Sequence, residues 1–389
     1  MISFRQGQMN SSFKNNVLLE QLTLALLVFI FSQCVLAVVL KYCDFGYFSS
    51  LNWIRWDSAH YLGIAEKGYE FFPCAGRFGY PLDSKDMCGN TAWFPGYSMV
   101  LRFLGLFFGD LILVGGIVSK FFYFLILFLV LRLAEMNVVS FRNFLFLSIA
   151  AFNFGFIYYN AIFPISGLVF CGLASYYFFQ KKNIWLSALF CFLSSFFYTT
   201  GFLVTVILWL FILLKLEGSL KQILQKAAII GISGLLGFLA VFLLIQVYVG
   251  DWGAFMQVQA KYGNGTVHNP FASMTSYIKK GLEVFSLENF KYYQTLFVAF
   301  MYLLLTVFFL FKRFYKNNLY TWSYLSVTIF LFFPWIMGGD VSFYRSEALL
   351  LPFVFVLKEA KTAWLAGILA VMVVLGIFMS RLFFLNILV

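Results

Sequence analysis

Charged residues and histidines are scarce in this sequence. Only 11% of its 389 residues are Asp, Glu, Lys or Arg, and it contains two histidines. Its cysteines and histidines show no spacing typical of a zinc site. A glycine-rich phosphate loop, an Asp-x-Asp nucleotide-sugar motif, internal repeats and low-complexity tracts are also absent. The sequence therefore gives no support to a zinc enzyme or a common nucleotide-binding enzyme, and we expect neither a cofactor nor a resident metal.

Apolar residues dominate instead. The chain is 62% hydrophobic and 22% aromatic, which is more apolar surface than a soluble domain of this length can bury. Runs of roughly 20 apolar residues, the length that crosses a hydrocarbon layer, recur along the chain. Backbone inside lipid must satisfy its own hydrogen bonds, so it forms helices or a closed barrel, and these runs lack the alternation of barrel strands. The sequence predicts an all-α polytopic membrane protein.

About eleven membrane-spanning helices are expected in a single domain covering residues 1–389. The predicted spans are 17–40, 111–131, 143–159, 162–179, 184–199, 201–214, 227–249, 293–311, 320–337, 347–357 and 363–385. The segment Phe94–Phe108 is expected to form an interfacial or re-entrant helix. Two hydrophilic stretches, 41–92 and 250–294, are expected on the outer face, where both contribute to an active site and the first contains short interfacial helices.

The formal net charge of +11 follows the membrane topology. Basic residues concentrate in the short loops of one side, while the segments of the other side mix both signs. This is the positive-inside pattern, and it places the N-terminus in the cytoplasm. It accounts for the basic excess without a nucleic-acid partner; the lipid bilayer is the expected environment. The compact length favours the cytoplasmic membrane of a prokaryote, with the ER membrane as the eukaryotic alternative.

Three of the six cysteines, Cys43, Cys74 and Cys88, lie in the first outer stretch. Cys74 and Cys88 are separated by glycine, proline and charged residues. In an oxidising compartment they can form a disulfide that closes the loop. Two free thiols are the alternative, and the sequence does not decide between them.

The densest cluster of charged and aromatic side chains follows the first apolar run. Residues 55–61 read Arg-Trp-Asp-Ser-Ala-His-Tyr, and helical spacing places Trp56 and His60 on one side with Asp57 adjacent. Further polar groups follow in the same loop at 93–102 and in four more outer turns, at 158–160, 198–200, 250–252 and 338–345. We expect these groups to converge on one membrane surface, as a site fed by a substrate carried in the lipid requires.

These motifs resemble those of a known family. Residues 55–62, with Ala65, Gly68 and Tyr69, resemble the first-loop signature of the PIG-V-like mannosyltransferases, which add the second mannose in GPI-anchor synthesis. Residues 92–97, Ala-Trp-Phe-Pro-Gly-Tyr, are similar to the family's Phe-Phe-Pro-x-Tyr-Pro element. Residues 250–255 resemble its Gly-Asp-Pro-x-Ala-Phe corner, and 343–345 with Pro352 resemble its late Arg…Pro element. The motifs occur in order over almost the whole chain.

The resemblance implies a GT-C glycosyltransferase that takes a sugar, mannose in that family, from a polyprenyl phosphate on the non-cytoplasmic face. The acceptor is a glycan or glycolipid, and the anomeric carbon is inverted. Asp57 is the candidate catalytic base, and Arg345 is the candidate phosphate ligand because its guanidinium can hold two oxygens. The other candidate substrate-binding residues are His60, Arg55, Arg102, Trp56, Tyr61, Trp93, Tyr97 and Asp251.

Each residue also has a structural interpretation. Asp57 can pair with Arg55 or Lys67, Arg345 can anchor a helix end by reaching toward the interface, and His60 can be a structural hydrogen-bonding residue. The tryptophans and Tyr97 can belong to an aromatic belt. Asp251 can shape a turn, as can Asp340.

Two other function classes stay open. A lipid-linked-sugar flippase would also be multi-span, but the chain offers only Lys120 as an ionisable residue deep in a span. A non-catalytic subunit with a small membrane partner is the second alternative. It is favoured by Tyr159-Asn160-Ala161 and Tyr198-Thr199-Thr200-Gly201, where the family carries an acid and an arginine. These departures also leave the donor sugar and the acceptor open.

Overall fold

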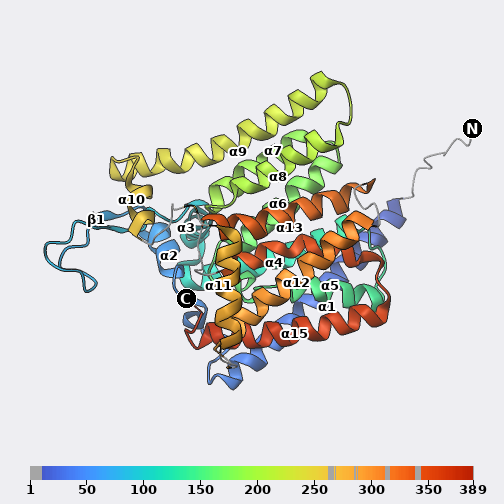
Figure 1. Cartoon of the computed structure of the whole chain (residues 1–389), viewed down its shortest axis with the longest axis horizontal. Coiled ribbons are helices and arrows are strands. Elements are labelled where there is room, and N and C mark those ends of the chain that lie inside the picture. Colours follow the sequence, from blue (N-terminus) through green and yellow to red (C-terminus); the bar gives the residue numbers. More distant parts are fainter. Residues whose placement is uncertain are drawn as a thin grey trace, which may run out of the picture.

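The computed structural model describes residues 11–261, 267, 269–283, 286, 288–311, 316–337 and 343–388. These residues form a bundle of helices with one short hairpin (Figure 1), so the predicted α-helical class is confirmed. Six helices of the described part are long and apolar enough to cross a membrane. They are α1 (Ser11–Tyr42), α4 (Leu111–Ala134), α9 (Leu220–Val249), α12 (Phe290–Phe311), α13 (Asn318–Met337) and α15 (Thr362–Phe384).

The other five predicted spans fall on shorter elements. These are α5 (Phe141–Ala151), α6 (Ile165–Gln180), α7 (Ile184–Phe197), α8 (Phe202–Lys215) and the 3-10 segment η4 (Glu347–Glu359). The span predicted over 143–159 is interrupted, because α5 ends at Ala151 and the chain turns at Gly155 before the 3-10 segment η2 (Phe156–Tyr159). Gly155 has φ +66°, and a Cβ there would lie 3.0 Å from the Tyr344 carbonyl oxygen. Glycine thus permits this turn to pack directly against the segment that carries Arg345.

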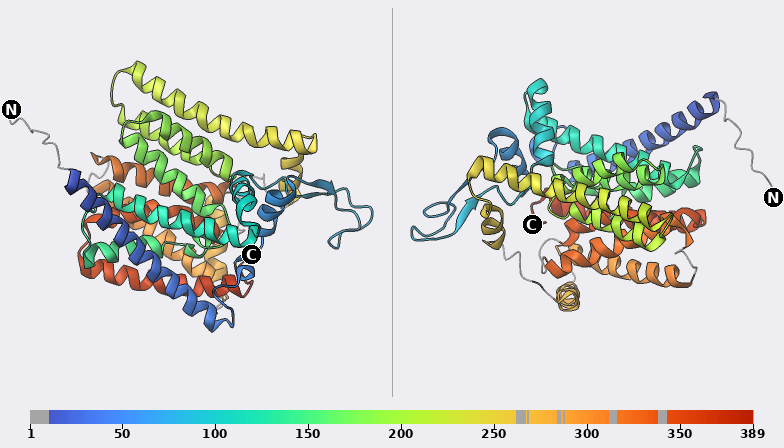
Figure 2. Two further views of the ribbon diagram at one scale, coloured as in Figure 1. Left: turned by 180° about the vertical axis from the view of Figure 1, so that it is seen from behind. Right: turned by 90° about the horizontal axis from the view of Figure 1, so that it is seen from above.

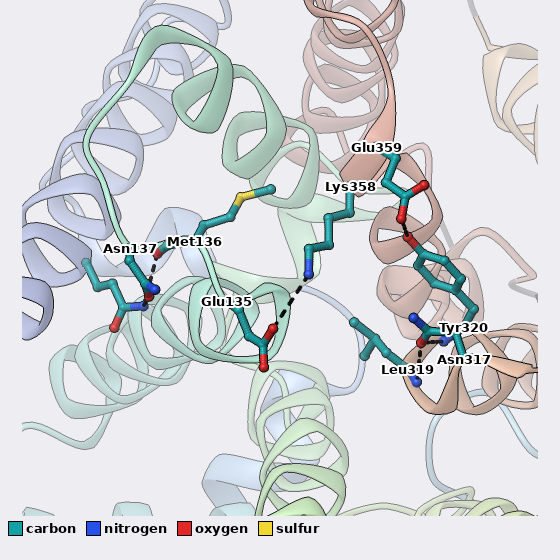
Figure 3. Close-up of polar contacts among 9 residues, drawn as sticks. Glu135, Met136, Asn137, Asn317, Leu319, Tyr320, Lys358 and Glu359 are labelled. Atoms are coloured by element: carbon teal, nitrogen blue, oxygen red, sulfur yellow. Dashed lines mark hydrogen bonds and ion pairs between the residues drawn. The ribbon is translucent and has the colours of Figure 1, made fainter. Parts of the chain in front are cut away.

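The loops near the N-terminal end of the bundle are joined by polar contacts (Figure 3). Lys358 Nζ lies 3.9 Å from Glu135 Oε2. The Tyr320 hydroxyl donates to Glu359 Oε1 at 2.9 Å. Gln21 Nε2 donates to the Met136 carbonyl at 3.0 Å. These contacts tie together the chain segments that the charge pattern predicts to be cytoplasmic.

The opposite end of the bundle carries the short elements (Figures 1 and 2). They are α2 (Ser58–Lys67), β1 (Phe71–Pro73), β2 (Met87–Gly89), α3 (Gly96–Phe108), α10 (Ala254–Lys261), α11 (Pro270–Glu283) and α14 (Phe343–Ser346). The segment predicted as an interfacial helix is therefore helical. In Figure 2, α3 runs across the direction of the long helices, and α11 does the same in Figure 1.

A disulfide closes the hairpin in the first outer stretch. Strands β1 and β2 pair antiparallel, with Phe72 opposite Cys88, and Cys74 is bonded to Cys88. Of the two alternatives left open by the sequence, the structure therefore has the disulfide. The hairpin end is also joined to the second outer stretch, since the Thr91 hydroxyl donates to the Ala254 carbonyl at 3.0 Å. The described parts of the two predicted hydrophilic stretches are thus in contact at this end of the bundle.

Candidate functional site

Asp57 and Arg345 form an ion pair at this end of the bundle. They are 288 residues apart in the sequence, and they come from the N-terminus of α2 and from α14. Asp57 occupies the N-cap position of α2, yet its side chain makes no capping hydrogen bond. An N-cap carboxylate ordinarily accepts from the first turn and stabilises the helix by about 1 kcal/mol. Here the carboxylate binds the guanidinium instead.

The backbone beside Asp57 is strained. Trp56 has φ +49°, a left-handed conformation that is unfavourable for a bulky residue. The residue is 42% exposed. The backbone amide of Arg55 donates to Ser58 Oγ at 3.1 Å, which helps to close the turn. Trp56 is thus partly exposed and directly precedes Asp57 in the sequence.

Arg345 lies in a nearly closed aromatic environment. Its guanidinium carbon lies 6.0 Å from the centre of the Tyr158 ring and 5.4 Å from that of Phe163. Burial acts to lower the pKa of Arg345, but the Asp57 carboxylate together with the Tyr198, Tyr158 and Tyr344 hydroxyls outweighs this effect and holds the pKa above its ordinary value. The guanidinium is therefore always charged. Its side chain is only 13% exposed.

Two buried polar atoms near this pair lack hydrogen-bond partners. They are Arg345 Nε and the Tyr158 hydroxyl, neither of which makes a hydrogen bond of normal geometry in the described part of the chain, although the Tyr158 and Tyr198 hydroxyls lie close enough to the guanidinium to interact with it. An unsatisfied buried donor costs about 1–3 kcal/mol, so such groups are rare and require an explanation. A ligand oxygen placed beside Arg345 would satisfy the Nε–H group. The pair is thus chemically incomplete on the guanidinium side.

Glu347 is a functional candidate that the sequence reasoning missed. It lies two residues beyond Arg345 and is buried. It accepts hydrogen bonds from Gln294 Nε2 at 2.6 Å and from the Thr295 hydroxyl, both on α12. These bonds fix the start of η4 to α12 and so determine where Arg345 projects. An acidic residue inside the apolar run 343–357 was the available signal, because such residues are rarely without a role.

His60 lies one turn after Asp57 and stacks on Trp93. The two ring centres are 3.6 Å apart with an interplanar angle of 13°. The carbonyl of Trp93 accepts from the Tyr69 hydroxyl at 2.9 Å, which fixes the stack. Burial lowers the pKa of His60, and this outweighs the opposing effect of Asp57. The imidazole is therefore neutral at neutral pH, and it can both donate and accept a hydrogen bond.

Arg55 lies apart from the pair and has a structural partner. Its guanidinium donates to the carbonyls of Phe383 at 3.4 Å and Phe384 at 3.1 Å, at the C-terminal end of α15. It also donates to Ile54. Cations are favourable at helix C-termini, where carbonyls lack partners. Arg55 thus joins the first outer stretch to α15.

Four further predicted site residues make contacts within the protein. The Tyr97 hydroxyl is buried and bonded to Gly115 O at 2.9 Å and Ser119 Oγ at 2.7 Å. Tyr61 is buried against Tyr97. Arg102 contacts the Tyr248 hydroxyl at 3.3 Å. Asp251 accepts from Gly253 N at 2.7 Å and from Gln257 Nε2 at 2.8 Å, which matches the turn-forming interpretation.

The convergence expected from the outer turns occurs in part. Tyr158 lies beside Arg345, and Tyr198 interacts with it electrostatically. Asp340 lies outside the described residues. Within the described part, no group of three His, Cys, Asp or Glu side chains could hold a metal ion.

No protein-family model matches this chain, and a search of the curated proteins finds no match either. The resemblance to the PIG-V-like mannosyltransferases therefore rests on the sequence motifs, and the site rests on its own geometry.

Proposed function

We propose that this chain is a GT-C-type glycosyltransferase similar to the PIG-V-like mannosyltransferases. It transfers a hexose, mannose in the first instance, from a polyprenyl phosphate to a glycan or glycolipid on the non-cytoplasmic face. The observation that carries this proposal is the ion pair between Asp57 and Arg345. Displacement of a lipid phosphate requires a base for the incoming hydroxyl and a cation that binds the departing phosphate. Asp57 and Arg345 would supply these two groups.

In the proposed reaction Asp57 removes the proton from an acceptor hydroxyl. The oxygen attacks the anomeric carbon of the donor and forms the new glycosidic bond. The bond between that carbon and the phosphate oxygen breaks, and the phosphate leaves with the electron pair. Arg345 stabilises the negative charge that develops on the phosphate. Attack from the face opposite the leaving group inverts the anomeric configuration.

The resting ion pair is compatible with this role. The Nε–H group of Arg345 is buried and has no partner among the described residues. A phosphate that binds there would compete with Asp57 for the guanidinium and release the carboxylate to act as base. The phosphate would thus accept a hydrogen bond from the Arg345 Nε–H group. Binding of the polyprenyl-phosphate sugar would at the same time activate Asp57.

The membrane arrangement is part of the proposal. The six long helices together with α5 to α8 and η4 would make eleven spans, with the N-terminus in the cytoplasm. Asp57 and Arg345 would then lie at the outer leaflet. A prenyl phosphate in that leaflet could reach them from within the membrane, while the acceptor arrives from the aqueous side.

The Asp57→Asn variant tests the proposal. The full chain in lipid nanodiscs would receive polyprenyl-phosphate mannose or glucose with a mixture of glycan acceptors, and release of polyprenyl phosphate would be measured. Loss of the base is expected to lower turnover about 10²–10⁴-fold. Glu66→Gln, an exposed acid on the same helix, is the matched control and should retain wild-type turnover. Equal turnover by Asp57→Asn and wild type contradicts the assignment.

Two outcomes of the same experiment would favour the alternative classes. Movement of intact donor between leaflets without cleavage would support a flippase. An inactive wild-type chain that copurifies with a stoichiometric membrane protein would support a non-catalytic subunit.

A further inference from the structure

A cleft of about 480 Å³ opens beside the first turn of α2. This volume lies within the range of about 300–1,000 Å³ that is typical of small-molecule sites. The cleft lies between α2, the disulfide-closed hairpin and α10. Its lining includes His60, Glu70, Phe72, Phe78, Tyr80 and Lys261. His60 follows Asp57 by three residues, so the cleft begins within one helical turn of the candidate base.

Three polar groups in this lining have no hydrogen-bond partner among the described residues. The ring nitrogens of His60, the Glu70 carboxylate and the Tyr80 hydroxyl make no hydrogen bond to any described residue. Asn90, in contrast, is fully engaged, because it binds the Gly68 carbonyl and the Glu70 amide. These three groups supply hydrogen-bond acceptors on Glu70, His60 and Tyr80 and donors on His60 and Tyr80 around one space.

The charges of the cleft nearly cancel. Glu70 is negative, Lys261 is positive, and burial keeps His60 neutral by lowering its pKa. Lys261 is also held in place, since its ammonium lies 5.2 Å from the centre of the Tyr80 ring and 3.4 Å from Cys88 Sγ. A balanced cleft of this kind does not favour an anion. It suits a ligand with many hydroxyl groups and no net charge.

Aromatic rings complete the lining. Phe72 and Phe78 line the cleft, and Phe78 is 77% exposed. An exposed phenylalanine contributes little burial energy to the fold, so its ring is available to pack against a ligand. A sugar ring has apolar C–H faces that pack on aromatic rings and hydroxyl edges that bond polar groups. Both kinds of group are present here.

We propose that this cleft binds a neutral sugar residue at the reacting end of the acceptor. The acceptor is accordingly a glycan that enters from the aqueous side, and its hydroxyl passes His60 to reach Asp57. This inference rests on the proposed function and specifies its substrate class. The disulfide and the contacts of Lys261 hold the hairpin wall against α10, so the cleft is preformed.

Binding without donor tests this inference. The full chain in nanodiscs would be titrated with methyl α-mannopyranoside and methyl β-glucopyranoside, with saturation-transfer NMR as the readout. At least one glycoside should bind saturably. Glu70→Gln and Tyr80→Ala should each weaken binding about tenfold, the equivalent of one lost hydrogen bond of about 1.4 kcal/mol. Glu66→Gln and Leu82→Ala are the matched controls, because both positions are exposed and outside the lining.

Three results would overturn the inference. The first is the absence of saturable binding for either glycoside, and the second is equal binding by wild type and both cleft variants. Displacement of the bound glycoside by inorganic phosphate at the same site would also contradict a neutral ligand. Because no donor is present, these results are independent of whether the chain cleaves polyprenyl-phosphate sugars. Failure of the proposed function would instead appear as absent donor cleavage by a wild-type chain that binds the glycoside.

Discussion

The two ends of the helix bundle each carry an ion pair, and the two pairs differ in burial. At the N-terminal end, the Lys358 and Glu135 side chains are 32% and 81% exposed, and their charged atoms are 3.9 Å apart. At the opposite end, the Arg345 and Asp57 side chains are 13% and 24% exposed and in direct contact. An exposed pair contributes about 0–1 kcal/mol. A buried pair must overcome a desolvation cost that can exceed its attraction.

The polar groups around the two pairs also differ in whether they have hydrogen-bond partners. At the N-terminal end, Gln21 and Tyr320 have partners on neighbouring segments. At the other end, Arg345 Nε and the Tyr158 hydroxyl have none in the described part of the chain. Selection for stability alone favours polar groups with hydrogen-bond partners and charges exposed to water. The end with Asp57 and Arg345 departs from both preferences, and it is the end at which we propose the active site.

Removing one partner of the buried pair should have the largest effect. Arg345→Gln leaves the Asp57 carboxylate without its partner, and loss of one member of a buried pair costs about 3–5 kcal/mol. Donor turnover should fall together with stability, because the proposed phosphate ligand is lost. Thermal unfolding in nanodiscs and release of polyprenyl phosphate measure the two effects.

The double variant Asp57→Asn with Arg345→Gln separates function from stability. It replaces the pair by neutral groups of similar shape, so most of the lost stability should return, since replacing both partners is often nearly neutral. Activity should stay absent. A double variant that regained turnover would mean that the pair serves the fold alone.

The left-handed residues at the two ends extend the comparison. Trp56 and Glu135 have φ +49° and φ +55°, a conformation that costs roughly 1–2 kcal/mol for a residue with a Cβ. Trp56→Gly should relieve this strain while removing the indole beside Asp57. We expect stability close to wild type and turnover about tenfold lower.

The Trp56→Ala variant is the control for the ring. It keeps the strain and removes the indole, so it should lose as much activity as Trp56→Gly. Full activity in both variants would support the aromatic-belt interpretation of Trp56, and loss in Trp56→Gly alone would assign the effect to the backbone.

Much of the helical framework could be predicted from the sequence, because runs of apolar residues long enough for lipid have few alternatives. Asp57 and Arg345 could be selected because charges are rare in the chain. Their contact depends on packing between segments 288 residues apart, which local patterns do not encode. The same applies to Arg55, whose partners are carbonyls at the end of α15. A basic residue in a dense cluster of charged and aromatic residues gives no sign that it will bind the carbonyls of a distant helix end.

Short elements were harder to predict for a related reason. Hydropathy marks an apolar run but not where the helix within it stops. The run 143–159 breaks because Gly155 can approach the backbone of Tyr344. Glu347 is placed by Gln294 and Thr295 of α12. Both features depend on tertiary neighbours, and both determine the position of Arg345.

The smallest effect is expected at the exposed pair. Glu135→Gly deletes the contact with Lys358, which is worth at most about 1 kcal/mol. It also places glycine at the left-handed residue that caps the C-terminus of α4, where glycine is preferred over other residues. The two effects oppose each other, so the free energy of unfolding should change by less than about 1 kcal/mol, and donor turnover should be unchanged. Lys358→Ala removes the pair without changing that backbone and should lower stability only slightly. If either variant abolished turnover, the two ends would not differ as their burial indicates, and the assignment of chemistry to the Asp57 end would lose its basis.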